Sequence, residues 1–216
     1  MALPTLPGSR ATSRDHLDAQ LAAHQIDANA FREVDVRSPI DVESRIASTP
    51  PDATAKGMYF EQVARAARPL GVPCESRYVA FRDYPLSDLM RLLAGAAKAC
   101  YPGRPTREAL RLMGRDAFGT LMSSVAGRVM FTFALGDAHS ALRLAPQAYK
   151  ASVSHCSVRV PVCTPEQVVL ELRNLWNFPE CYQVGVLEAG SAAFGPLPHL
   201  KTRVLSACDV DVLVRW

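Results

Sequence analysis

CSVRVPVCTPEQVVLELR, residues 156–173, alternates apolar and polar side chains in two runs with a turn sequence between them. Alternation with a period of two is typical of β-strands, because successive side chains point to opposite faces of a sheet. Thr164, Pro165 and Glu166 supply the turn. The stretch therefore predicts a β-hairpin, with Pro161 in an edge strand because proline cannot donate a ladder hydrogen bond.

The residues that follow extend this pattern into a small sheet. Residues 180–195 are rich in Ala and Gly and predict a helix that packs closely on a sheet. Two further alternating runs, residues 200–206 and 210–216, predict two more strands. The C-terminal third therefore predicts the order β-β-α-β-β, and an antiparallel four-stranded sheet is the simplest way to pair its strands.

The residues before this unit have the periodicity of helices. Apolar side chains recur at spacings of three and four in five runs, at residues 15–24, 38–48, 56–70, 87–100 and 105–121. A strongly apolar stretch at 129–135 follows, and a further helix is expected over residues 138–149. Helices before a sheet predict an α+β fold. We expect a loose tail and a short helix over residues 1–34 and a single α+β domain over residues 35–216.

Length and composition exclude several classes of protein. The chain has 216 residues, of which 49% are hydrophobic and 21% charged, as in ordinary globular domains. Its 24 Lys and Arg against 21 Asp and Glu give a net charge of +3, which is too small and too dispersed for a nucleic-acid-binding protein. No apolar run is long enough to span a bilayer, and residues 1–14 do not resemble a signal peptide, so the protein is expected to be cytoplasmic.

The sequence lacks the motifs of metal sites and of the common enzyme classes. Its six cysteines are scattered without zinc-site spacing, so no metal site is expected and the thiols are predicted to be reduced. A redox or metal role for Cys156, Cys163, Cys181 and Cys208 stays open as an alternative. Nucleophile-elbow, metalloprotease, phosphate-loop and dinucleotide-binding patterns are missing. We therefore expect a protein that is not an enzyme and carries no cofactor.

Four arginines form the strongest electrostatic feature of the sequence. Arg104, Arg107, Arg111 and Arg115 are spaced by three and four residues, so a helix would place them along one basic face. Such a face could bind phosphates or an acidic partner. The simpler interpretation is a solvated face, because Glu108 lies at helical spacing from two of these arginines and can pair with them.

Seven aromatic residues are candidates for lining an apolar ligand pocket between the helices and the sheet. They are Tyr59, Phe60, Tyr84, Phe131, Phe133, Trp176 and Phe178. Aromatic side chains are also the usual filling of a hydrophobic core, which is the competing interpretation.

Several segments resemble a large paralogous family of myxobacterial proteins of unknown function. They are DVESRIASTPPDATAKGMYF (41–60), YPLSDLMRLLAGAAKACYPGRPTREALRLMGR (84–115), the glycine-bounded stretch 127–136 and CDVDVLVRW (208–216). The resemblance extends over residues 35–216. More distantly, the order of elements resembles haem-NO/oxygen-binding (H-NOX) domains, vinyl-reductase-type sensor domains and TRAPP-type vesicle-tethering domains, in which a helical part leads into a β-β-α-β-β unit.

The H-NOX resemblance implies a haem, but the residues that would bind it do not match. A five-coordinate haem needs an imidazole ligand on a helix, and H-NOX domains hold the propionates with a Tyr-x-Ser-x-Arg stretch. The corresponding stretch here is WNFPE, residues 176–180. His139 and His155 are expected at a helix start and at a strand entry. The resemblance therefore implies the shape of these domains with the haem lost.

The favoured interpretation is a non-catalytic sensor or regulatory domain that holds a small apolar ligand between helices and sheet. The alternative is a protein-interaction module like the TRAPP-type domains, which dimerise through helices. In either case a signal must pass through another chain, so we expect a partner protein, and a homodimer is one candidate assembly.

Overall fold

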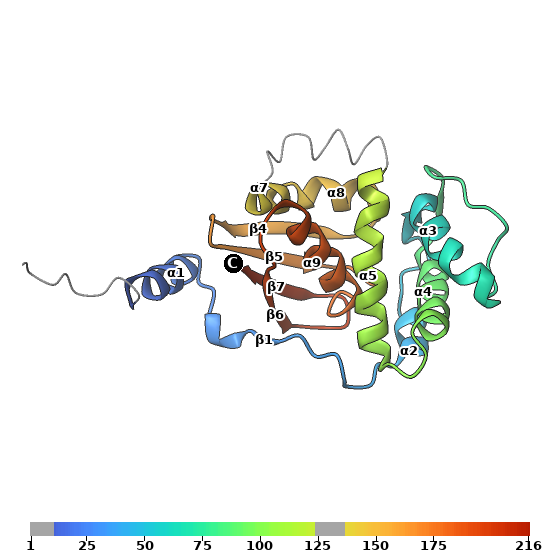
Figure 1. Ribbon diagram of the computed structural model, residues 1–216, viewed down its shortest axis with the longest axis horizontal. Coiled ribbons are helices and arrows are strands. Elements are labelled where there is room, and N and C mark those ends of the chain that lie inside the picture. The colour runs from blue at the N-terminus through green and yellow to red at the C-terminus, as the bar shows by residue number, and fades with distance from the viewer. Residues whose placement is uncertain (1–10, 124–136) are drawn as a thin grey trace, which may run out of the picture.

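The described residues, 11–123 and 137–216 of this computed structural model, form helices followed by an antiparallel sheet (Figure 1). The long helix α5 (Thr106–Ser123) stands between a group of helices and the sheet. This arrangement confirms the predicted α+β class. Within the described ranges, no helix combines the length and apolarity that a membrane-spanning segment requires.

The helical group contains three α-helices, a short 3-10 helix and a small ribbon of two strands. Its elements are α2 (Val42–Ala47), β2 (Thr54–Lys56), α3 (Gly57–Ala67), η2 (Arg68–Leu70), β3 (Asp83–Pro85) and α4 (Leu86–Cys100). Helix α4 begins directly after Pro85 and buries a stripe at spacings of three and four, which includes Leu89, Leu93 and Ala96. The β2–β3 ribbon was not predicted, because three residues are too few to show an alternating pattern.

The C-terminal unit has the predicted order of strands and helix. Its elements are β4 (Ser157–Cys163), β5 (Gln167–Arg173), α9 (Tyr182–Phe194), β6 (His199–Val204) and β7 (Val210–Arg215). All neighbouring strands are antiparallel, with Leu170 opposite Val212 and Leu200 opposite Val214. Strand β4 lies at an edge of the sheet, and its pairing with β5 shifts register next to Pro161. The edge position expected for this proline is therefore confirmed.

The sheet has five strands, one more than the four predicted. The extra strand is β1 (Arg32–Glu33), which pairs with β6 at the other edge and gives the order β1-β6-β7-β5-β4. Two residues cannot produce a detectable alternation, so this strand is formed by tertiary pairing and not by local sequence preference. Before it come α1 (Ala11–Ala23) and the short η1 (Ala28–Ala30).

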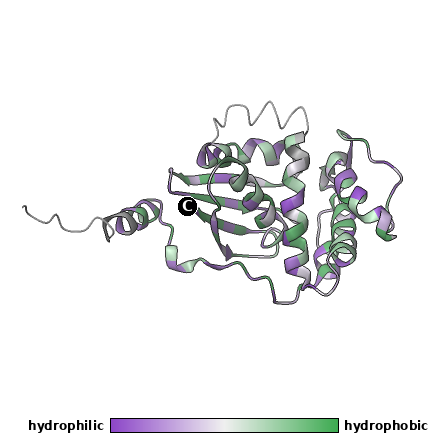
Figure 2. Ribbon diagram, viewed as in Figure 1, coloured by the Kyte–Doolittle hydropathy of each residue, from purple (hydrophilic) through white to green (hydrophobic). Residues whose placement is uncertain are grey.

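The two faces of the sheet are covered unequally. Val210, Val212 and Val214 of β7 face the helices and belong to the main core. The opposite face carries a small second cluster that the N-terminal segment covers, formed by Leu21, Ile26, Phe31, Val162, Val169 and Leu213. Figure 2 shows that hydrophobic residues predominate in the central strands of the sheet. The main core therefore lies between the sheet and the helices, which is where a buried site could form.

The helix predicted over residues 138–149 is two helices. They are α7 (Ala138–Arg143) and α8 (Ala145–Ser152), which meet at Leu144. Pro146 lies in the first turn of α8, where its missing N–H costs no hydrogen bond but ends the preceding helix. The division lets α8 take its own direction and carry Tyr149 into the core.

Candidate functional site

The connection between β5 and α9 holds a buried loop with an unusual backbone. Asn174 and Phe178 have φ angles of 52° and 56°, a left-handed conformation that costs a non-glycine residue about 1–3 kcal/mol. Phe178 is fully buried, and its carbonyl accepts hydrogen bonds from the backbone N–H groups of Cys181 and Gln183. Packing and hydrogen bonds thus hold the loop in place, and with it the side chain of Asn177.

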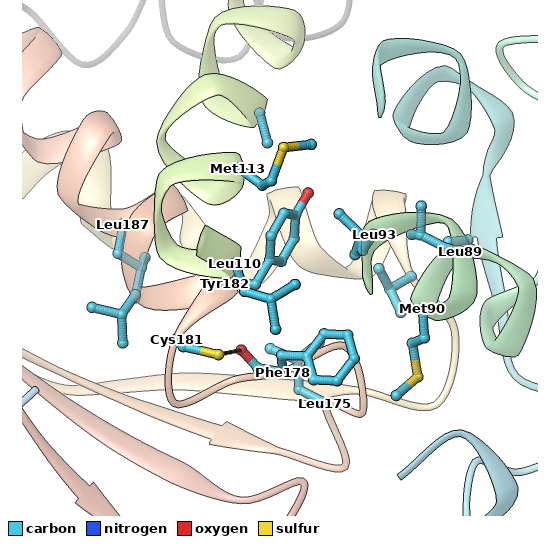
Figure 3. Packing of buried hydrophobic residues seen from close by; sticks show 14 of the residues in the cluster. Leu89, Met90, Leu93, Leu110, Met113, Leu175, Phe178, Cys181, Tyr182 and Leu187 are labelled. Carbon is cyan, nitrogen blue, oxygen red and sulfur yellow. Dashed lines mark hydrogen bonds between the residues drawn. The ribbon is translucent and has the colours of Figure 1, made fainter. Parts of the chain in front are cut away.

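Helices α5 and α9 cross at two glycines. A Cβ atom added to Gly114 would clash with the carbonyl oxygen of Tyr182, and one added to Gly185 would clash with the carbonyl oxygen of Arg111. The backbones are therefore in direct contact, which only glycine allows. In Figure 3 the ring of Tyr182 extends from α9 beside α5 toward the gap between Met113 and Leu93. The crossing fixes where this tyrosine enters the core.

A cavity of about 60 Å3 lies beside the crossing. Its walls come from α3, α4, α5, α8, α9 and the 174–181 loop, so it joins the helical group to the sheet unit. The lining residues are Tyr59, Leu89, Ala117, Phe118, Ala148, Tyr149, Ser152, Val153, Asn177, Tyr182, Gln183 and Val186. None of these lining residues is charged. The cavity is mostly apolar with a few polar groups, as is typical of small-molecule sites.

Two of the three tyrosines in the wall have hydrogen-bond partners. The Tyr59 hydroxyl lies 2.5 Å from the Ser152 hydroxyl, which itself donates to the Ala148 carbonyl, so Tyr59 is the donor of the pair. The Tyr149 hydroxyl donates to the side-chain oxygen of Gln183 at 2.7 Å. These bonds fix the two rings and leave the Gln183 amide nitrogen without a partner among the described residues.

Two other polar groups of the cavity wall are unpaired. Asn177 is only 2% exposed, and its side-chain oxygen has no hydrogen-bond partner. Within the described ranges the Tyr182 hydroxyl has none either. Buried polar groups in native proteins are nearly always hydrogen-bonded, so the enclosed Asn177 oxygen is an exception. Water or a ligand in the cavity would provide a partner for the Tyr182 hydroxyl.

All three tyrosines are neutral phenols over the usual pH range. Burial raises the pKa of Tyr149 well above its ordinary value, and it also raises the pKa of Tyr182. Burial raises the pKa of Tyr59 as well, although its hydrogen bond to Ser152 acts in the opposite direction. The cavity thus offers neutral donors and acceptors and no anionic phenolate.

A second cavity of about 50 Å3 adjoins the first. The two share Phe118, Ala148, Tyr149 and Val186, so these side chains form the partition between them. The rest of the second wall is apolar and consists of Ala141, Leu142, Ala145, Leu187 and Gly190.

The aromatic residues proposed from the sequence do not form one pocket. Tyr59 lines the first cavity. Phe60 and Tyr84 do not line it; within the same core they pack with Tyr78, with ring centroids 5.0–5.2 Å apart. Phe178 is buried beneath Tyr182 (Figure 3), and Trp176 is partly buried against the same core. Phe131 and Phe133 lie outside the described residues.

The four arginines proposed as a basic face have partners within the chain. Arg111 and Arg115 both bind the two carboxylate oxygens of Glu188 on α9, at 2.8–3.0 Å. Arg104 pairs with Glu108 at 2.7 Å.

Arg107 belongs to a different set of contacts at the start of α5. It lies 3.3 Å from the buried carboxylate of Glu180, which also binds Arg45, and its Nε donates to the Ser38 carbonyl. These contacts connect α5 to α2 and to the 174–181 loop.

Glu188 is the electrostatic centre of the α5–α9 contact. Burial by itself would raise its pKa, but the hydrogen bonds from Arg115 and Arg111 outweigh burial and hold the pKa below its ordinary value. The carboxylate is therefore ionised and bound to two guanidinium groups.

Sequence reasoning missed most of the residues that line the cavity. Tyr149, Asn177, Tyr182 and Gln183 are not among the candidate site residues that the sequence suggests. The available signal was a polar Asn177 between Trp176 and Phe178, in a segment whose other residues are mostly apolar. Only the tertiary structure brings α8, α9 and the 174–181 loop together.

The overall fold is that of H-NOX domains. The unliganded Fe(II) H-NOX A71G mutant from K. algicida has a TM-score of 0.57 and 14% sequence identity, covering 74% of this chain and 95% of that one. The SO2144 H-NOX domain from Shewanella oneidensis in its Fe(II)CO state has a TM-score of 0.55 and 15% identity, with 74% and 97% covered. At these identities the likeness concerns the fold alone.

The residues of the cavity do not fit a haem. All five histidines of the chain fall in the described ranges, and none lines the cavity. His139 binds Asp137, and His155 lies 3.2 Å from Asp52. A site for a drug-sized ligand or cofactor occupies roughly 300–1,000 Å3, far more than the space beside Tyr182. No group of three His, Cys, Asp or Glu suited to a metal ion occurs among the described residues.

No curated protein matches the sequence. A family model described as "Protein of unknown function (DUF2378)" matches residues 49–216 and so spans most of the chain, including every residue of the cavity wall. The predicted membership of a family of unknown function is thereby confirmed, whereas the myxobacterial origin and the vinyl-reductase and TRAPP resemblances stay predictions. The chain belongs to this family of unknown function, DUF2378.

Proposed function

We propose that the chain is a non-catalytic sensor or regulatory domain that binds a small ligand, without haem, in the cavity beside Tyr182. The observation that carries the proposal is a mostly apolar cavity with unpaired polar groups, at the junction of the helical group and the sheet unit. A fold whose solved neighbours include a domain titled "oxygen binding H-NOX domain related to soluble guanylate cyclases" supports a sensing role.

The position of the cavity gives ligand binding a way to change the conformation of the domain. Its wall combines Tyr59 and Leu89 of the helical group with Ala148, Tyr182 and Val186 of the elements around the sheet. A ligand that contacts both parts favours the arrangement in which they fit it best, and a partner protein can read that shift. The neutral tyrosines and the uncharged wall favour binding over acid–base or nucleophilic catalysis.

Native mass spectrometry of the purified chain, with an absorption scan through the visible range, tests this function. We expect a small bound mass and no Soret band. Ala148→Leu, which adds carbon atoms inside the cavity, should lose the bound mass, whereas Ala151→Leu on the exposed side of the same helix should keep it. A Soret band would overturn the haem-free proposal. A bare mass, both as purified and after incubation with a small-molecule extract of the host cells, would overturn the sensor proposal.

A protein-interaction module is the second candidate, and one observation favours it. Val79 and Phe81, in the segment before β3, are 55% and 69% exposed, which is unusual for large apolar side chains so close together in the chain. Light scattering of the eluted protein, compared with Phe81→Ser, tests this candidate. A dimer that the substitution converts to a monomer supports it, and a monomer in both cases contradicts self-association through this segment.

A further inference from the structure

We infer that the ligand is a small neutral amphiphile, with one hydrogen-bonding head group held by Asn177, Tyr182 and Gln183 and a short apolar tail in the second cavity. This inference rests on the proposed function and names the chemistry of its ligand. It concerns the polar residues of the cavity wall, to which the comparison with H-NOX domains assigns no role.

The head-group site is formed by three polar side chains that lack a complete set of partners. The Asn177 side chain makes no hydrogen bond within the described residues, and because its oxygen is enclosed by the protein, its amide nitrogen is the group left to donate to a ligand. The Tyr182 hydroxyl is likewise unpaired there, and Gln183 uses its oxygen for Tyr149 but leaves its nitrogen free. Together these groups can donate to and accept from a hydroxyl, a ketone or a carboxamide.

The wall excludes ions. No Asp, Glu, Lys, Arg or His lines either cavity. An anion or a cation would lose its hydration on entry and meet no opposite charge, which is strongly unfavourable. Arg111 and Arg115 of α5 do not line the cavity and are bound instead to Glu188 of α9.

The second cavity provides a place for the tail. Apart from Tyr149 its wall is entirely apolar, and Phe118 and Val186 lie between it and the head-group site. A cavity of roughly 150 Å3 holds a benzene molecule of six heavy atoms. The two cavities, about 60 and 50 Å3, therefore match a molecule of about four or five heavy atoms once the shared side chains move apart.

A series of probes with five heavy atoms separates head-group recognition from simple cavity filling. We would titrate 2-butanone, 1-butanol, propionamide, n-pentane and propionate into the full chain with labelled methyl groups, and follow Ala148, Val186 and Leu89 by NMR. The three neutral amphiphiles should shift these methyl signals and bind about three- to tenfold more tightly than pentane. Propionate should not bind.

Three variants locate the head and the tail. Tyr182→Phe and Asn177→Leu should each reduce the preference for the amphiphiles over pentane about three- to tenfold. Tyr101→Phe, which removes a hydroxyl bound to Asp116 outside the cavity, is the matched control and should change nothing. Gly190→Ala, whose Cβ would lie 3.1 Å from the Phe118 ring, should weaken 1-butanol more than propionamide because it fills the tail site.

The outcomes distinguish this inference from the function on which it rests. If pentane or propionate binds as tightly as the amphiphiles, the cavity binds ligands but the head-group inference is wrong. If none of the five probes moves the cavity methyl signals, both the inference and the proposed function fail. Should Asn177→Leu not fold, Tyr182→Phe still decides the matter, because it removes only one hydroxyl oxygen.

Discussion

The α5–α9 crossing and the cavity beside it both include residues of these two helices, yet polar side chains are paired at the crossing and unpaired in the cavity. At the crossing the backbones touch, and the carboxylate of Glu188 is bound by two arginines. Beside it, Tyr182 and Asn177 are buried without partners among the described residues. The first region is a fixed frame. The second has space and unused hydrogen-bonding capacity, which is what a ligand site needs before the ligand arrives.

The largest expected effect comes from separating the helices at the crossing. Gly114→Ala places a Cβ atom against the carbonyl oxygen of Tyr182, where only backbone movement can relieve the clash. We expect a loss of about 3 kcal/mol or more in the free energy of unfolding, measured by urea denaturation. Gly119→Ala in the same helix is the control, because an added Cβ there meets nothing within 4 Å. It should be neutral or stabilising by up to about 1 kcal/mol. Equal effects of the two substitutions would show that the crossing is not a tight contact.

Sequence patterns could predict the frame far better than the site. The alternating runs around Leu170 and Val212 and the apolar stripe of α4 are local signals, and they identified the strands, the helices and the α+β class. Asn177 and Tyr182 belong to a site formed where three features meet. These are the 174–181 loop with its left-handed residues, the division between α7 and α8, and the α5–α9 contact at two glycines. Nothing local in the sequence encodes that convergence, and the two-residue strand β1 was missed for the same reason.

The next largest effect should come from the ion pairs of the frame. Glu188→Gln removes the negative charge that two arginines share, and we expect it to lower the free energy of unfolding by about 2 kcal/mol, since hydrogen bonds to charged groups contribute about 1.5–3 kcal/mol. Glu108→Gln is the matched control, because its partner Arg104 is exposed. It should cost less than about 0.5 kcal/mol. Comparable losses for the two variants would contradict the role given to Glu188.

The same carboxylate predicts how the stability of the frame depends on pH. The folded-state pKa of Glu188 lies below its ordinary value of 4.5, so the stabilisation is present above that value and is lost as the pH falls through the lower folded pKa. The difference in unfolding free energy between the wild-type chain and Glu188→Gln should therefore be constant above pH 4.5 and shrink below it. Urea titrations at neutral pH and near about pH 3 measure this change. A difference that grows on acidification would reverse the sign and refute the assignment.

A smaller effect is expected for the hydrogen bond between Tyr149 and Gln183 in the cavity wall. Tyr149→Phe removes the hydroxyl that donates to Gln183 and leaves that amide oxygen buried without its donor. The expected loss is about 1 kcal/mol in the free energy of unfolding. Urea denaturation measures the loss, and Tyr101→Phe provides a reference for a hydroxyl whose partner, Asp116, is exposed. A change near zero would mean that Tyr149 does not hold the partition in place.

The smallest expected effect on stability is the most informative test of the difference between the crossing and the cavity. Tyr182→Phe removes a hydroxyl that no described residue binds, so in the ligand-free chain it should change the free energy of unfolding by less than about 0.5 kcal/mol, although the residue is as buried as Tyr149. Its effect should instead appear in the response to ligand, because the stabilisation that 2-butanone gives the wild-type chain should fall in the variant. Thermal unfolding with and without 2-butanone measures both quantities. A loss in the ligand-free chain as large as that of Tyr149→Phe would show that Tyr182 serves the frame, and the contrast between the two regions would then disappear.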